Sequence, residues 1–197
     1  MKTPVNRFKQ AILNKQVQYG LWVSMGSAYS TEICAGAGFD WLLLDCEHAP
    51  NDLQSILMQL QITAAYPDTH SVVRMPVGHG HAGVTLIKQF MDAGATTILV
   101  PMVDTAEQAH PDVKAAIEDA FRRILKAGKA PGILTPDETL ARHYLEHGGV
   151  FVAVGTDSNL LARHTSALCQ RFKNPASTSH SKTKAYPPCH TRFPATR

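Results

Sequence analysis

The 197-residue chain is long enough for one domain with a buried core, and its 44% hydrophobic and 18% charged residues are typical of a globular protein. No apolar stretch reaches the roughly 18 to 20 residues that span a bilayer, and the first residues lack the apolar core of a signal peptide, so we expect no membrane partner. The net charge of +3 comes from residues 173–197, which hold five basic residues and no acid. The remainder carries about −2, which argues against a nucleic-acid partner.

The four cysteines form no C-x-x-C pair, which excludes a zinc ribbon and a thioredoxin-like motif. Cys34 and Cys46 lie in apolar runs, and buried unpaired thiols are typical of a reducing compartment. We therefore expect a cytoplasmic protein.

Short apolar runs alternate with helical patterns along the chain. The first helix is predicted with Phe8, Ile12 and Leu13 on one face. Strands are predicted at 20–24, 41–45, 71–74, 97–103, 130–134 and 150–154. Further helices are predicted at 31–37, 53–65, 84–92, from Thr105, and at 111–126, 139–146 and 160–172.

This alternation, with strands that are apolar throughout, predicts a parallel sheet in an α/β fold. A (β/α)-barrel and an open doubly wound sheet both fit. Polar residues that follow strands favour the barrel, whose sites lie at the carboxyl ends of its strands: Asp45, Glu47, His48, Arg74, Asp104 and Asp157. The open sheet predicts a glycine-rich phosphate loop, and residues 24–28 are too poor in glycine for one.

A complete barrel has eight strands and about 250 residues, whereas this chain supplies six strands. We therefore predict an incomplete (β/α)8 TIM-barrel type, with about six of the eight strand–helix units, in residues 1–173. Two unpaired edges and a gap are expected where the missing units would lie. Residues 174–197 are rich in Pro, Ser and Thr and lack periodicity, which predicts a disordered basic tail.

The most informative segment places Asp45, Glu47 and His48 within four positions at a strand end. A histidine is the natural general base near neutral pH, and a nearby carboxylate raises its basicity and fixes its tautomer. The same spacing also fits a histidine that caps the next helix, and the segment alone does not decide between the two interpretations.

Two further charged residues occupy informative positions. Arg74 ends the third predicted strand, where its guanidinium can bind a carboxylate or a developing enolate oxygen. The alternative is a surface salt bridge, which the apolar Met75 and Pro76 that follow disfavour. Asp92 stands at a helix C-terminus, which the helix dipole disfavours, so a specific partner is expected rather than a merely solvated acid.

Several segments together resemble the HpcH/HpaI-type class II aldolases, which act on 4-hydroxy-2-oxoheptanedioate and 2-keto-3-deoxy sugar acids. The similarity covers about residues 8–172, and its most specific parts are the E-H-A-P block and the V-P-M-V block. The matching segments are 20–23, 35–50, 72–74, 99–109, 127–134 and 151–157.

The resemblance implies divalent-metal-dependent cleavage of 4-hydroxy-2-oxo acids to pyruvate and an aldehyde, with Mg, Mn or Co as cofactor. It implies that His48 is the base at the substrate hydroxyl and that Asp92 raises its basicity, across a subunit contact in one arrangement. Arg74 would stabilise the pyruvate enolate, and Asp45 and Glu47 would organise the loop and water. Homo-oligomers, often hexamers with an exchanged terminal helix, are also implied.

The resemblance further implies two metal-binding acids, in a Q-x-E or V-E element and in a G-P-x-D-L-S element, and this sequence contains neither. The chain passes from Ala109 directly into His110, where those units would stand. Because a hard cation needs anionic oxygen ligands held in place, we expect impaired aldolase activity, with the metal ligands unknown.

Two hypotheses from other classes remain open. One is a non-catalytic fragment or regulatory subunit that associates with full-length aldolase, and the other is a binding protein for small oxo acids. Two histidine pairs are also considered as metal ligands. The first, His79 and His81, is expected in a glycine-rich loop; the second, His143 and His147, has helical i, i+4 spacing but shows no third ligand, so a solvated face is the favoured interpretation.

Overall fold

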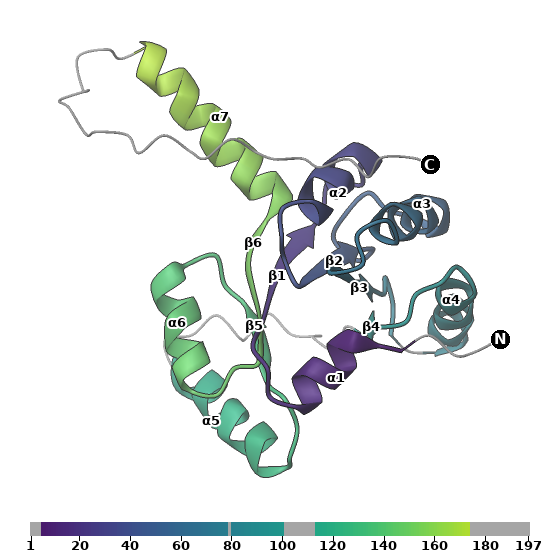
Figure 1. Cartoon of the computed structure of the whole chain (residues 1–197), viewed down its shortest axis with the longest axis vertical. Coiled ribbons are helices and arrows are strands. Elements are labelled where there is room, and N and C mark those ends of the chain that lie inside the picture. Colours follow the sequence, from purple (N-terminus) through teal and green to yellow (C-terminus); the bar gives the residue numbers. More distant parts are fainter. Residues whose placement is uncertain (1–4, 79, 101–112, 174–197) are drawn as a thin grey trace. The chain divides into compact units, whose positions relative to one another are not determined.

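The computed structural model describes residues 5–78, 80–100 and 113–173, which form alternating strands and helices (Figure 1). The chain divides into two compact units, Met1–Ser158 and Asn159–Arg197, and the described part of the second unit is helical. In chain order the elements are α1 (Arg7–Leu13), β1 (Gln18–Val23), α2 (Ala28–Ala35), β2 (Trp41–Asp45), α3 (Leu53–Thr63), β3 (His70–Arg74), α4 (Gly80–Asp92), β4 (Ile98–Leu99), α5 (Val113–Lys126), β5 (Gly132–Leu134), α6 (Glu138–Glu146), β6 (Phe151–Thr156) and α7 (Asp157–Lys173).

All six strands predicted from the sequence are present. Four predictions fall wholly or partly outside the described residues: the strand through residue 103, the polar residue Asp104 after it, the helix from Thr105 and the tail 174–197. Two details of the prediction are wrong. Helix α4 begins at Gly80, so His81 lies on a helix rather than in a loop, and Leu13 is 63% exposed rather than packed beside Phe8.

The strand order establishes the kind of sheet. All strand pairs are parallel, and the order is β4-β3-β2-β1-β6-β5. Every neighbour is consecutive in the chain except β1 and β6, the first and the last strand. That pairing closes a ring in a barrel, and a doubly wound sheet has a different order. The fold is therefore an incomplete TIM barrel, opened between β4 and β5, as predicted.

Strand β2 explains why its sequence is apolar without alternation. Leu42 and Leu44 pack outward with residues of the covering helices, whereas Trp41 and Leu43 pack inward with the interior of the sheet. Both faces are buried, as in parallel sheets covered by helices. The following residue on the inward face is Asp45, so the strand delivers a carboxylate to the interior at its carboxyl end.

Helix α1 covers the amino ends of the strands. Phe8 is buried there, stacked on His70 with ring centroids 5.3 Å apart and packed against Trp41 and Phe151. Gly20 makes room for this cluster, because a Cβ at that position would come within 2.1 Å of the Trp41 indole.

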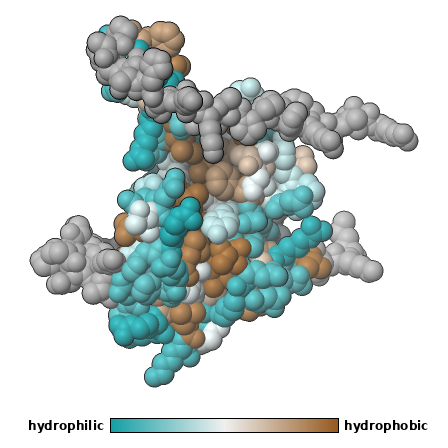
Figure 2. All heavy atoms as spheres, turned by 60° about the vertical axis from the view of Figure 1, so that its left-hand side comes forward, coloured by the Kyte–Doolittle hydropathy of each residue, from teal (hydrophilic) through white to brown (hydrophobic). Residues whose placement is uncertain are grey.

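Within the described residues, the interior of the sheet contains a cavity. A largely apolar cavity of about 340 Å³ is lined by residues of both β4 and β5, together with α1 and the inward side chains of β1, β2, β3 and β6. Within the described ranges, no strand pairs with the outer edge of β4 or of β5. Figure 2 shows apolar side chains between polar ones on one face of the molecule. In the same ranges, no helix is both long and apolar enough to cross a bilayer.

Candidate functional site at the carboxyl ends of the strands

Strands β2 and β3 bring two charged residues together. The register pairs Asp45 directly with Arg74, and both are the last residues of their strands. Their inward neighbours two positions earlier, Leu43 and Val72, belong to the interior cluster, so both charged side chains belong to the same face of the sheet.

Asp45 fixes the loop that follows its own strand. Its Oδ1 accepts hydrogen bonds from the backbone N–H groups of Glu47 (2.9 Å) and His48 (3.3 Å). Its Oδ2 accepts from Trp22 Nε1 at 3.2 Å and lies 3.5 Å from Arg74 Nη1. Asp45 is only 2% exposed, so these contacts are shielded from water. The carboxylate therefore holds the loop, the arginine and the tryptophan in one arrangement.

Glu47 joins Arg74 to His48. Its Oε2 forms an ion pair with Arg74 Nη2 and lies 3.9 Å from His48 Nε2. The side chain of His48 is 73% exposed, whereas those of Glu47 and Arg74 are mostly buried. The guanidinium also lies 5.9 Å from the centre of the Trp22 ring. Imidazole and guanidinium thus belong to one cluster, with the histidine on its solvent side.

The cluster has a negative charge balance. Asp45 and Glu47 contribute two negative charges and Arg74 one positive charge, so the net charge is about −1 while His48 is neutral. Arg74 Nε is buried and has no hydrogen-bond partner among the described residues. A buried donor without a partner is unfavourable, and an anionic oxygen of a ligand would satisfy it.

Asp92 does not join this cluster within one chain. It is the last residue of α4 and is exposed. Helix α4 returns from the carboxyl end of β3, and the residues just after it, including Gly94, line a cavity with His70, the first residue of β3. Asp92 therefore lies near the amino ends of the strands, away from His48 of the same chain.

Two residues have roles that the sequence only partly indicated. Trp22 donates a hydrogen bond to Asp45 and faces Arg74. The only indication of this role in the sequence is its position on β1, which pairs it with Leu43 of β2. Asp157, one of the polar residues noted after strands, is 6% exposed and accepts hydrogen bonds from Ser24 N (2.9 Å) and Ser24 Oγ (3.0 Å). It anchors the turn after β1 and contacts no residue of the cluster in these bonds.

Buried thiols lie close to this layer without taking part in it. Burial, reinforced by the negative charge of Asp157, raises the pKa of Cys34 to about 11. Burial also raises the pKa of Cys46, with further contributions from Asp45 and Asp52. Both are therefore protonated near neutral pH and unsuited to act as nucleophiles or metal ligands.

The cluster does not fit the divalent metal that the family resemblance implies. Both Asp45 oxygens already accept hydrogen bonds, and Glu47 is ion-paired with Arg74, whose positive charge opposes a nearby cation. Asp45, Glu47 and His48 also do not converge as a ligand trio; among the described residues a different trio does so. The implied metal ligands are thus absent from this end of the described sheet.

Comparison with known proteins gives matches in both sequence and fold. The profile of the HpcH/HpaI aldolase/citrate lyase family matches residues 18–118. A 4-hydroxy-2-oxovalerate aldolase from Rhodococcus jostii is 39% identical, with 87% of this chain and 98% of that protein covered. A hydroxypyruvate/pyruvate aldolase from Pseudomonas aeruginosa is 38% identical, with 94% and 100% covered. The fold resembles a solved HpcH/HpaI family protein from Burkholderia cenocepacia, with a TM-score of 0.78, 24% identity, and 86% and 100% of the chains covered.

The alignment lengths also show an internal difference. The alignment with the Rhodococcus aldolase spans 256 positions but covers 87% of these 197 residues, which is about 171. About 85 aligned positions therefore have no residue of this chain opposite them, so the chain is shorter than its relatives. With a family profile over half its length and relatives at 38–39% identity, this chain belongs to the HpcH/HpaI aldolase/citrate lyase family.

Proposed function

We propose that this chain is a carbon–carbon lyase polypeptide of the pyruvate aldolase type. Its cluster serves the divalent-metal-dependent cleavage and condensation of 4-hydroxy-2-oxo acids, giving pyruvate and an aldehyde, and turnover is impaired because the metal-ligand segment is missing. The observation that carries the proposal is the contact network of Asp45, Glu47, His48 and Arg74 at the carboxyl ends of β2 and β3.

Each side chain has a role in this proposal. Arg74, with its unpartnered Nε, binds the carboxylate or the enolate oxygen of the 2-oxo acid. In cleavage, the bond between C3 and C4 breaks, its electron pair forms the pyruvate enolate, and the hydroxyl proton at C4 passes to His48. Asp45 and Glu47 position the loop and the two reacting side chains. Asp92 of a neighbouring copy would orient His48, which makes a homo-oligomer, in the family a hexamer, part of the proposal.

Impairment follows from charge. A 2-oxo acid is an anion, and the described cluster carries a net charge of about −1. Substrate binding and enolate formation therefore both place negative charge beside the negatively charged cluster. A bound Mg, Mn or Co ion would offset this repulsion in a site with metal ligands. The absence of that offset raises the barrier by several kcal/mol, and each 1.36 kcal/mol slows the reaction about tenfold.

A graft tests the proposal. The stretch that relatives carry between the positions of Ala109 and His110 is inserted into this chain, and pyruvate formation from 4-hydroxy-2-oxoheptanedioate is followed by coupling to lactate dehydrogenase. We expect Mn-dependent pyruvate release, and its loss when Arg74→Ala is added to the graft. A folded graft, verified by circular dichroism, that makes no pyruvate with any of the three metals would refute the proposal.

A second candidate is a non-catalytic subunit that associates with full-length aldolase. It is favoured by the edges of β4 and β5, which no strand of the described residues pairs with, and by the apolar cavity between them, because unpaired parallel edges readily accept another chain. In the described part of the second unit, four apolar side chains of α7 are exposed by 42 to 80%: Leu160, Leu161, Leu168 and Phe172. Co-expression with a tagged full-length relative distinguishes the candidates: a stable complex whose activity changes supports the second, and separate elution excludes it.

A further inference from the structure

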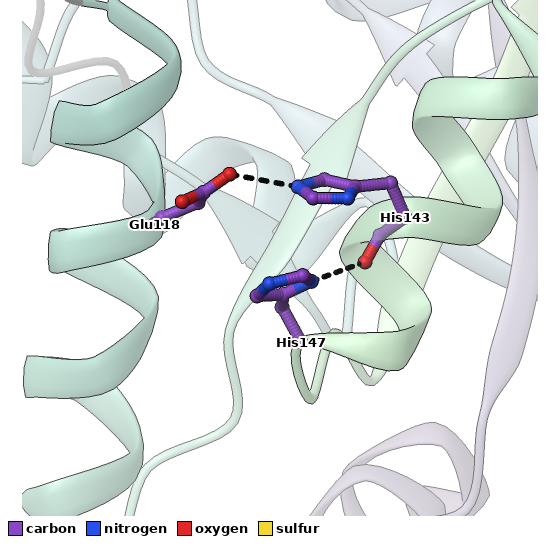
Figure 3. A group of neighbouring side chains, drawn as sticks. All are labelled: Glu118, His143 and His147. Carbon is purple, nitrogen blue, oxygen red and sulfur yellow. Dashed lines mark hydrogen bonds and ion pairs between the residues drawn. The ribbon is translucent and has the colours of Figure 1, made fainter.

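Three potential metal ligands meet between α5 and α6, away from the cluster described above. Glu118 of α5 lies opposite His143 of α6, with Oε1 2.8 Å from Nε2, and His147 follows one turn later (Figure 3). One ligand atom of each residue lies within 4.8 Å of the other two. Glu118, 25 residues earlier in the chain than His143, thus supplies the third candidate ligand that the i, i+4 spacing of His143 and His147 did not reveal.

A backbone contact sets the tautomer of His147. Its Nδ1 lies 2.8 Å from the carbonyl oxygen of His143, and because a carbonyl can only accept, Nδ1 must carry the proton. Nε2 then keeps its lone pair for a metal. A histidine ligand whose other nitrogen donates to a backbone carbonyl is the usual arrangement at protein metal sites.

The two helices hold the ligands on a packed support. Phe121 of α5 and Tyr144 of α6 are 3% and 4% exposed, and their rings pack with centroids 5.5 Å apart. Glu118 lies one turn before Phe121, and His143 directly precedes Tyr144. The aromatic contact therefore fixes the separation of the two backbones that carry the ligands, as a preformed site requires.

We propose that Glu118, His143 and His147 bind a late first-row transition-metal ion, with Zn²⁺ as the best fit. Two imidazoles and one carboxylate suit Zn²⁺, Co²⁺ or Ni²⁺, whereas Mg²⁺ and Ca²⁺ prefer all-oxygen sites. Bonds of about 2.1 Å in a tetrahedron separate ligand atoms by roughly 3.4 Å. When the ion binds, the Nε2 proton of His143 that bonds to Glu118 Oε1 moves to Nδ1 of the same ring or is released. The ligand side chains then close the remaining distance, and water takes the fourth position.

The position of this site assigns it a structural task. Helix α6 ends before His147, and β6 starts at Phe151, so the trio lies beside the amino ends of the strands. The candidate catalytic cluster lies at their carboxyl ends. A bound ion would join α5 to α6 next to β5, the strand whose outer edge is open in the described residues. The site is independent of the aldolase proposal, and neither stands or falls with the other.

Metal titration of the purified, EDTA-treated chain tests the site. Zn²⁺ binding is measured by calorimetry, and Co²⁺ binding by the visible absorption of the four-coordinate ion. The test variants are His147→Ala, whose side chain is exposed, and Glu118→Gln, which preserves size. His164→Ala, an exposed histidine on α7, is the matched control for binding by histidines elsewhere in the chain.

We expect wild type and His164→Ala to bind one more equivalent of Zn²⁺ than His147→Ala. Zn²⁺ should raise the melting temperature of wild type and His164→Ala more than that of His147→Ala. Glu118→Gln should bind Zn²⁺ at least about tenfold more weakly than the wild type, and Mg²⁺ should not compete with Zn²⁺. Equal stoichiometry and affinity in wild type and His147→Ala would overturn the site, as would a melting temperature that Zn²⁺ raises equally in both. The trio would then be a hydrogen-bonded contact between two helices only.

Discussion

Replacing Asp45 by alanine should destabilise the fold, because it removes the contacts that hold the candidate site together. The carboxylate is buried, accepts hydrogen bonds from two backbone N–H groups and from the Trp22 indole, and forms an ion pair with the Arg74 guanidinium. Removing one partner of a buried ion pair costs about 3 to 5 kcal/mol. Arg74 keeps its pair with Glu47, and the freed loop amides can reach water. We therefore expect the lower end, a loss of about 3 kcal/mol in the free energy of unfolding.

Urea denaturation followed by far-ultraviolet circular dichroism measures this loss. Asp52→Ala is the matched control, since it also removes a carboxylate that accepts a backbone N–H, but at the exposed N-cap of α3, and its loss should be clearly smaller. Asp45→Asn should fall between the two, because its amide oxygen still accepts from the loop while its NH₂ faces two donors. A loss below about 1 kcal/mol for Asp45→Ala, or one no greater than that of Asp52→Ala, contradicts the reasoning.

Three further predictions follow from charges and burial. Burial lowers the pKa of His70 below 6.5, so the stability that the neutral imidazole contributes is full above pH 6.5 and is lost as pH falls toward the pKa of the folded state. The urea midpoint of His70→Gln should therefore change less between pH 7 and 5 than that of the wild type, and an equal change in both would exclude this. Cys169 is exposed and should react with iodoacetamide at pH 8, whereas Cys34 and Cys46 should not, as peptide mass spectrometry would show; equal labelling of all three would contradict their burial. Glu47→Gln removes a negative charge beside the guanidinium and should tighten binding of the pyruvate analogue oxalate about tenfold by calorimetry, and weaker binding would refute the charge argument.

Most of the fold could be predicted because the strands are buried on both faces. Residues 41–44, for example, are apolar without alternation, and strands of this kind separated by helices have only one consistent topology once a barrel is assumed. The opening between β4 and β5 followed from counting strands. The start of α4 at Gly80 was mispredicted because glycine has a low helix propensity, and the packing of Leu13 because an apolar residue at a helix end need not be buried.

The candidate site was predictable in part only. Asp45, Glu47, His48 and Arg74 stand at strand ends, so their proximity follows from the parallel sheet. Trp22 could be found only from the register of β1 against β2. Asp92 does not share this proximity, because α4 carries it to the opposite end of the sheet.

The ligand Glu118 was missed for a different reason. Helical spacing identifies ligands on one helix, as for His143 and His147, but it carries no information about which face of a second helix lies opposite. That information comes from the packing of Phe121 against Tyr144.

Pyruvate release by the purified 197-residue chain is the most direct measurement. The chain is incubated with 4-hydroxy-2-oxoheptanedioate and Mg²⁺, Mn²⁺ or Co²⁺, and lactate dehydrogenase reports the product. A rate equal to that of Arg74→Ala with every metal is the expected result, because the described cluster has no place for the cation that must balance the enolate. Metal-stimulated release that Arg74→Ala abolishes would show that this chain holds its catalytic metal after all.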